Sequence, residues 1–154
     1  MKTIRTTLLA ALLCSTTLTT ALITPKSFAA DDARELVNFP DMMRNHMLTN
    51  MRDHLLALQE IQQFMAAAEY EKAADVAENR LGMSSLKAHG AEHMAQMMPP
   101  AMQEIGTGMH HAASQFAITL RDTAVDDGDL KPAMAGMAKI MQQCVACHTA
   151  YRVH

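Results

Sequence analysis

Apolar side chains recur every three or four residues through most of the chain after residue 40, which is the spacing of amphipathic α-helices. Strand-forming residues are sparse, whereas Ala, Met, Leu, Gln and Glu, all good helix formers, are abundant. The sequence therefore predicts an all-α fold.

The expected helices cover residues 41–67, 70–81, 100–123 and a segment that starts at residue 130. Asp41 and Asp129 are the expected capping residues of the first and last helices, and Gly82 is the expected stop of the second. Residues 83–98 contain Gly90 and precede Pro99-Pro100, so we expect this segment to be only partly helical. Short connections between amphipathic helices favour an antiparallel four-helix bundle.

Two apolar rows define the expected inner faces of the first and last helices. The row on the first helix is Met47, Leu48, Met51, Leu55, Leu58, Ile61 and Met65. The row on the last helix is Leu130, Met134, Met137, Met141, Cys144, His148 and Tyr151. In the third helix, Gly106 and Gly108 lower helix stability, so we expect them to mark the close approach of another backbone or of a bound group.

Residues 1–30 have the pattern of a secretory signal peptide. Lys2 and Arg5 precede an apolar run, and Ser27-Phe28-Ala29 is a small-x-small cleavage site. Cys14 follows a leucine where a lipoprotein signal requires a small residue, so we expect no membrane anchor on the mature form. The sequence thus predicts export to the periplasm and one mature domain over residues 31–154.

A Cys-x-x-Cys-His unit, Cys144-Val-Ala-Cys147-His148, lies close to the C-terminus. This is the unit that attaches a c-type haem: each thiol adds to one vinyl group, and the histidine becomes an axial iron ligand. The alternative is a redox or zinc Cys-x-x-Cys followed by an incidental histidine, but a thioredoxin-type motif follows a strand and opens a helix. We therefore expect one covalent haem c, with Cys144 and Cys147 as thioether anchors and His148 as proximal ligand.

Charge excludes one class of partner. Removal of Lys2, Arg5 and Lys26 with the signal lowers the formal net charge from -3 to -6. An acidic surface repels nucleic acid and favours a redox partner protein with a basic docking face. Acidic residues are also the ordinary composition of a solvated surface.

With the haem unit, two further features match a known family. Tyr151 and Arg152 follow His148 by three and four residues, and the unit closes a chain of amphipathic helices. In these features the sequence resembles the class II cytochromes c, which include cytochrome c prime and its low-spin relatives. The resemblance implies a four-helix bundle whose first helix faces the sixth position of the haem iron. If the last helix continues beyond His148, Arg152 lies near the histidine and could pair with a haem propionate.

The resemblance leaves the sixth ligand open. Met51 is the first candidate, and Met47 is one helical turn away on the same face. A methionine ligand implies a six-coordinate electron carrier, whereas Leu48 over the iron implies a five-coordinate protein that binds nitric oxide or carbon monoxide. In many members a basic residue one turn before the distal position pairs with a propionate. Arg44 has this relation to Leu48 and not to Met51.

Other patterns give weaker expectations. His46 and His54 are expected at the margin of the first helix, away from Met51, so we expect no enzyme. Residues 83–111 are rich in His and Met, and His89 and His93 are spaced to share a metal such as copper. Both residue types are also common in cores and on surfaces. An apolar outer stripe on the first two helices could form a homodimer.

Overall fold

The computed structural model describes residues 31–125 and 128–154, of which residues 32–154 form one compact unit. The expected signal peptide, with Cys14, lies outside the described residues. The described chain is mostly helical, which confirms the all-α prediction. Its only strands are the two-residue β1 and β2, which pair in parallel.

The elements follow the order expected from the apolar spacing, with short irregular turns added. In chain order they are β1 (Glu35–Leu36), α1 (Asp41–Ala66), α2 (Tyr70–Val76), a π-helical turn η1 (Ala77–Leu81), a 3-10 turn η2 (Met83–Ser85), α3 (Ala91–Ala95), α4 (Pro100–Val125), α5 (Leu130–Ala150) and β2 (Tyr151–Arg152). Residues 83–98 are thus partly helical, as predicted.

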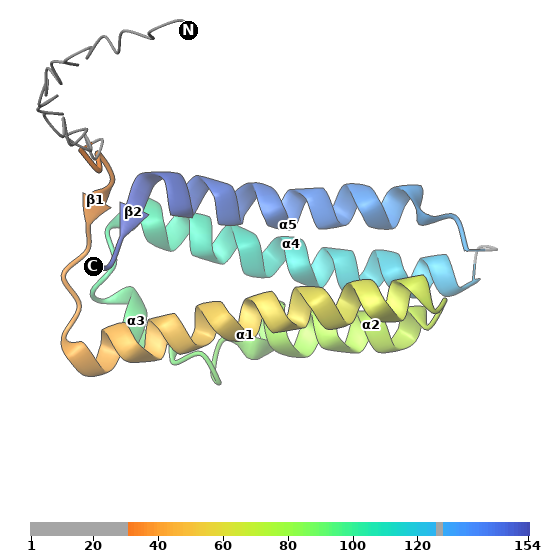
Figure 1. Cartoon of the computed structure of the whole chain (residues 1–154). Coiled ribbons are helices and arrows are strands. Elements are labelled where there is room, and N and C mark those ends of the chain that lie inside the picture. Colours follow the sequence, from red (N-terminus) through yellow and green to blue (C-terminus); the bar gives the residue numbers. More distant parts are fainter. Residues whose placement is uncertain (1–30, 126–127) are drawn as a thin grey trace, which may run out of the picture. The chain divides into compact units, whose positions relative to one another are not determined.

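The longer helices run alternately in opposite directions (Figure 1). Helix α1 packs on α2, α2 packs on α4, and α4 packs on α5. The β1–β2 pair joins the two ends of the unit, because Glu35 is in register with Tyr151 and Leu36 with Arg152. Both strands and α3 lie at one end of the long helices in Figure 1.

Three predictions about helix ends can be compared with the structure. Asp129 caps α5 as predicted, since its side chain accepts a hydrogen bond from the Lys131 backbone N–H at 3.0 Å. Asp41 does not cap α1: it lies within the first turn and pairs with Arg44 Nη2 at 2.8 Å. The last helix does not continue through Arg152 but ends at Ala150, because Tyr151 and Arg152 pair with β1.

A core cluster of alanines and larger apolar side chains fills the end of the unit away from the strands. Its buried members are Ala57, Leu58, Ile61, Met65, Ala73, Ala74, Ala77, Leu81, Met109, Ala113, Phe116, Ala117, Leu120, Ala133, Met137 and Ile140. The apolar row of α1 is largely correct, but Leu55 is 68% exposed, because the buried face passes through Ala57 instead. On α5 the predicted row is correct at Met137, which is buried, but Met134 and Met141 are exposed and the neighbouring Ala133 and Ile140 are buried in their place.

This displacement on α5 has a packing cause. Alanine and glycine allow two helix backbones to approach closely, so the face with Ala133 and Gly136 turns inward, and Met134 and Met141 turn outward. An ideal Cβ on Gly136 would lie 2.9 Å from Phe116 Cδ2 on α4.

A second, cavity cluster lies at the end with the strands and is rich in methionine. Its buried members are Val37, Phe39, Met47, Met94 and Met102, and Met43, Met51, Met98, Cys147, Tyr151 and Val153 pack against them. Among the described residues, no helix is long and apolar enough to cross a bilayer.

Candidate functional site

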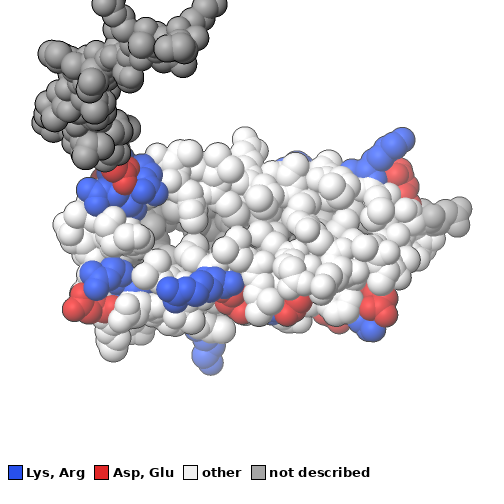
Figure 2. All heavy atoms as spheres, in the orientation of Figure 1, with Lys and Arg blue, Asp and Glu red and all other residues white. Residues whose placement is uncertain are grey.

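The cavity cluster surrounds a cavity of about 290 Å³. It is lined by residues from α1, the 83–98 segment, α4 and α5, and by residues from the N-terminal and C-terminal segments of the described chain. Figure 2 shows a hollow between the surfaces of α1 and α5 at this end. Farther along, the surface between these two helices is largely uncharged. The cavity is therefore bounded by parts of the chain that are distant in sequence.

Most of the residues predicted for a binding site line this cavity. Met47, Leu48 and Met51 contribute from α1, and Cys147 and His148 contribute from the last turn of α5. The His148 side chain is also exposed to solvent. The structure thus brings the predicted distal and proximal residues to a single space.

The two thiols near the end of α5 have different surroundings. Cys147 packs against the cavity cluster, and Cys144, one turn earlier, packs against the core cluster. Both are free and partly buried, and burial raises the pKa of each thiol. Neither is therefore an acidic, activated thiol of the kind that redox enzymes use.

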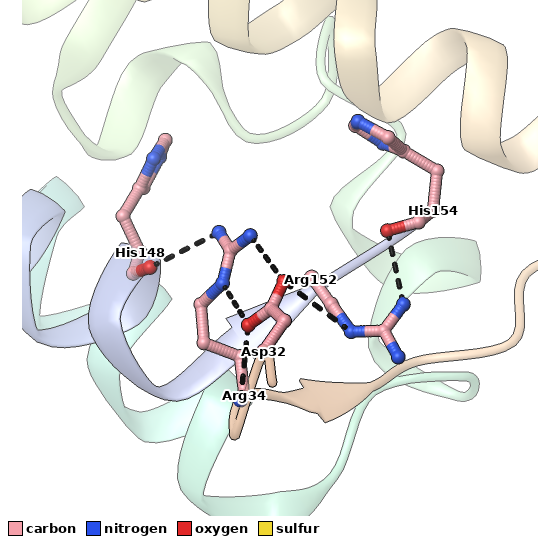
Figure 3. Close-up of polar contacts among 5 residues, drawn as sticks. All are labelled: Asp32, Arg34, His148, Arg152 and His154. Atoms are coloured by element: carbon pink, nitrogen blue, oxygen red, sulfur yellow. Dashed lines mark hydrogen bonds and ion pairs between the residues drawn. The ribbon is translucent and has the colours of Figure 1, made fainter. Parts of the chain in front are cut away.

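Two arginines border the cavity beside His148 (Figure 3). Arg34, which precedes β1, donates from Nη1 to the His148 carbonyl at 3.4 Å and from Nη2 to Asp32 Oδ2 at 2.7 Å. The hydrogen bond from Arg34 lowers the pKa of Asp32 to about 2. Arg152 Nη1 donates to the His154 carbonyl at 3.1 Å, and Arg152 Nε lies 3.6 Å from Asp32 Oδ2. This Nε is buried without a hydrogen-bond partner among the described residues.

Arg44, the other basic residue predicted for the site, is placed differently. It is not among the residues that line the cavity, and its guanidinium pairs with Asp41 in the same helical turn. Arg34 lies at the cavity instead.

Three imidazoles gather along one wall of the cavity, and we call them the histidine cluster: His54, His89 and His110. Their ring centroids are 4.8 Å apart for His54 and His89, 5.5 Å for His89 and His110, and 6.1 Å for His54 and His110. Burial lowers the pKa of all three, and that of His54 falls to about 4. All three are therefore neutral at pH 7. His54 Nε2 is buried and has no partner among the described residues.

The 83–98 segment is held against the long helices by hydrogen bonds that position this cluster. His46 Nε2 donates to the His89 carbonyl at 2.9 Å, and Asn50 Nδ2 donates to the same oxygen at 3.1 Å. At the end of η1, where the helix terminates, the Leu81 carbonyl accepts from His110 Nδ1 at 2.7 Å.

The prediction that His89 and His93 could share a metal is wrong. His93 is exposed on α3, whereas His89 lies beside His54 and His110. Within the described ranges, no three His, Cys, Asp or Glu side chains already converge in an arrangement that could hold a metal ion.

The sequence missed two parts of this site. The prediction of His54 at the helix margin is wrong: His54 follows Met51 by three residues, shares its face of α1 and lines the cavity. Arg34 carries no local signal, because it reaches the cavity only through the β1–β2 pairing of the two ends.

Comparison of the chain with models of known protein families, with curated proteins and with solved structures gives no match in any of the three.

Proposed function

We propose that this protein is a periplasmic class II cytochrome c, a four-helix bundle that transfers electrons through one covalently attached haem. The supporting observation is the cavity, where Met51 of α1 lies in the same lining as Cys147 and His148 of α5. Residues 144–148 supply the attachment unit, and the signal sequence of residues 1–30 supplies the export that c-type haem attachment requires.

The chemistry of the lining suits a haem. Methionine side chains surround the cavity and exclude water from an apolar macrocycle. The Arg152 Nε–H has no hydrogen bond within the described chain, although Asp32 Oδ2 lies 3.6 Å away, and a propionate would satisfy it. Arg34 adds a second positive charge at the same edge. Arg44 does not line the cavity, whereas Arg34 and Arg152 do, so we assign the propionate contact to Arg152 and Arg34.

In this proposal each residue has a defined task. Cys144 and Cys147 would hold the haem by thioether bonds, and the His148 imidazole and the Met51 thioether would bind its iron. The bound haem supplies an iron that changes between Fe(III) and Fe(II). The Met51 thioether stabilises the reduced state, and His148, exposed at the end of α5, places the haem near the surface where a partner docks.

The partner is a redox protein, and the formal charge of -6 without the signal favours one with a basic docking surface. We propose neither nucleic acid binding nor catalysis. A homodimer could use Leu55 and Leu56 of α1, which are 68% and 48% exposed. No large exposed hydrophobic residue of α2 joins them, so the outer stripe expected across the first two helices is confined to α1.

The second candidate function is a five-coordinate cytochrome c prime that binds nitric oxide or carbon monoxide. The observation in its favour is that Leu48 lines the same cavity as Met51. Met47, the other thioether candidate, also lines it and is 7% exposed.

The test is expression of the full chain in a host with intact cytochrome c maturation, followed by mass determination and optical spectroscopy. We expect the mass of residues 31–154 plus one haem, and a low-spin spectrum with the far-red band of methionine-to-Fe(III) charge transfer. Colourless protein with the mass of the bare polypeptide would contradict the proposal.

The ligand is then tested with Met51→Leu. We expect this variant to lose the far-red band and, when reduced, to bind carbon monoxide. Met43→Leu is the matched control, because Met43 packs in the same cluster on α1 but does not line the cavity. An unchanged far-red band in Met51→Leu would transfer the ligand role to Met47. A wild-type spectrum that is high-spin and responds to carbon monoxide would favour the five-coordinate alternative.

A further inference from the structure

The histidine cluster is not used by the proposed haem ligation. It joins three elements: His54 on α1, His89 in the segment before α3, and His110 on α4. We propose that these three side chains form a binding site for one transition-metal ion of the kind that imidazole ligands favour, represented by Zn²⁺, through their Nε2 atoms.

The hydrogen bonds leave the right nitrogen of His110 available. The Leu81 carbonyl can only accept, so the contact at 2.7 Å requires a proton on His110 Nδ1. The neutral ring then carries a lone pair on Nε2. A backbone carbonyl that fixes the far nitrogen in this way is the usual support of a metal-binding histidine.

Ser85 does the same for His89. Its hydroxyl donates to the Gly82 carbonyl at 2.7 Å, so its oxygen accepts from His89 Nδ1 at 3.3 Å. Neutral His89 therefore also has its lone pair on Nε2. The third member, His54, has its buried Nε2 without any partner in the described chain.

Two of the three ring separations suit a shared ion. Imidazoles that bind one Zn²⁺ tetrahedrally at about 2.0–2.1 Å have ring centroids about 5 Å apart, because each centroid lies just over 1 Å behind its ligating nitrogen. The separations of 4.8 Å (His54 and His89) and 5.5 Å (His89 and His110) are close to this distance, whereas His54 and His110, at 6.1 Å, must approach each other to share the ion. The nitrogens do not yet converge on one point. Binding therefore requires the rings to turn, and turning His54 breaks no hydrogen bond at Nε2.

The neutral state of the three rings also suits metal ligation. Burial keeps the three rings neutral, so a metal has no proton to displace at pH 7. Asp53, the neighbour of His54, contributes a negative charge, although Arg80 Nη2 already pairs with it at 2.5 Å. Three neutral ligands leave a fourth position for water.

The test is a Zn²⁺ titration of the haem-loaded protein by calorimetry, with the haem spectrum recorded on the same sample. In that state His148 is occupied by iron and cannot bind Zn²⁺. We expect one ion per chain in the wild type and at least tenfold weaker binding in His54→Gln. His111→Gln is the matched control, because His111 is exposed on α4 next to a cluster member.

A second variant, His89→Gln, should weaken binding to the same extent, and it covers the case in which His54→Gln fails to fold. X-ray absorption at the zinc edge should show three imidazole ligands. Absence of a stoichiometric site in protein with a normal haem spectrum, or equal binding by His54→Gln and wild type, would overturn the metal site and leave the haem proposal intact. Protein without haem would contradict the proposed function, and the loss of binding in His54→Gln relative to His111→Gln would still report on the cluster.

Discussion

The two ends of the described unit are built from different side chains, and the difference separates stability from function. The core cluster consists of alanines around larger side chains such as Phe116 and Ile61, and its helices pack closely. The cavity cluster consists mostly of methionines, beside which three histidines and two arginines border an open space. Methionine adapts to irregular spaces, so the cavity end can receive a large group whose contacts the core end does not need.

The largest expected loss of stability comes from a substitution in the core cluster. Phe116 is fully buried, and Phe116→Ala removes a ring that fills the centre of the core cluster. We expect the free energy of unfolding to fall by about 3–5 kcal/mol, because the lost burial and the remaining cavity both contribute. Urea unfolding followed by circular dichroism measures this change.

Ile118→Ala is the control on the same helix, since Ile118 is 51% exposed. Its effect should stay near the small values typical of surface positions. If the two variants were equally stable, Phe116 would not be the centre of the core.

The core end and the cavity end also differ in how much of each could be predicted from the sequence. The helices of the core end were predictable, because apolar spacing, Gly82 and the Asp129 cap are local signals. The face that α5 buries was not, because close packing against Gly136 and Ala133 decides it. Periodicity cannot register the size of the neighbour across the interface.

At the cavity end, most of the residues that the long helices contribute were predictable. The residues brought in by the 83–98 segment and by the two strands were not. That Met51 meets Cys147 and His148 at one cavity was expected from the family resemblance, which rests on the Cys-x-x-Cys-His motif. The histidine cluster and Arg34 depend on how the 83–98 segment and the two strands fold back. These are contacts between distant parts of the chain, for which a single sequence carries no local signal.

The second prediction concerns acid and a residue of the cavity end. His54 has a folded-state pKa of about 4 against an ordinary value of 6.5, so the unfolded chain binds more protons between these values. The unfolding free energy therefore falls as the pH drops below about 6.5. We expect His54 alone to contribute a loss of about 2 kcal/mol between pH 7 and pH 5.

Urea midpoints at the two pH values, with a chelator present, measure this loss in wild type and in His54→Gln. The variant should lose less stability on acidification, whereas Phe116→Ala should keep the wild-type pH dependence. An identical pH dependence in His54→Gln and wild type would show that His54 is not held neutral by burial.

The smallest expected effect is also the most direct contrast, because one substitution is made at both ends. Gly136 on α5 faces Phe116, and a Cβ added at Gly136 would lie 2.9 Å from the Phe116 ring. Gly106 on α4 lines the cavity, and a Cβ added there would have no neighbouring atom within 4 Å. Gly136→Ala should lower the unfolding free energy by about 1 kcal/mol, because crowding outweighs the gain in helix propensity. Gly106→Ala in haem-free protein should raise it by about 0.5–1 kcal/mol, since alanine favours the helix and meets no neighbour.

Denaturant midpoints measure both changes, and we expect the midpoint to fall in Gly136→Ala and to rise in Gly106→Ala. If both variants were destabilised, the cavity end would be packed as closely as the core. Repeating the Gly106→Ala measurement on haem-loaded protein sharpens it further. The stabilisation should shrink or reverse there if the haem lies against Gly106, because the added methyl group would then meet the macrocycle instead of open space.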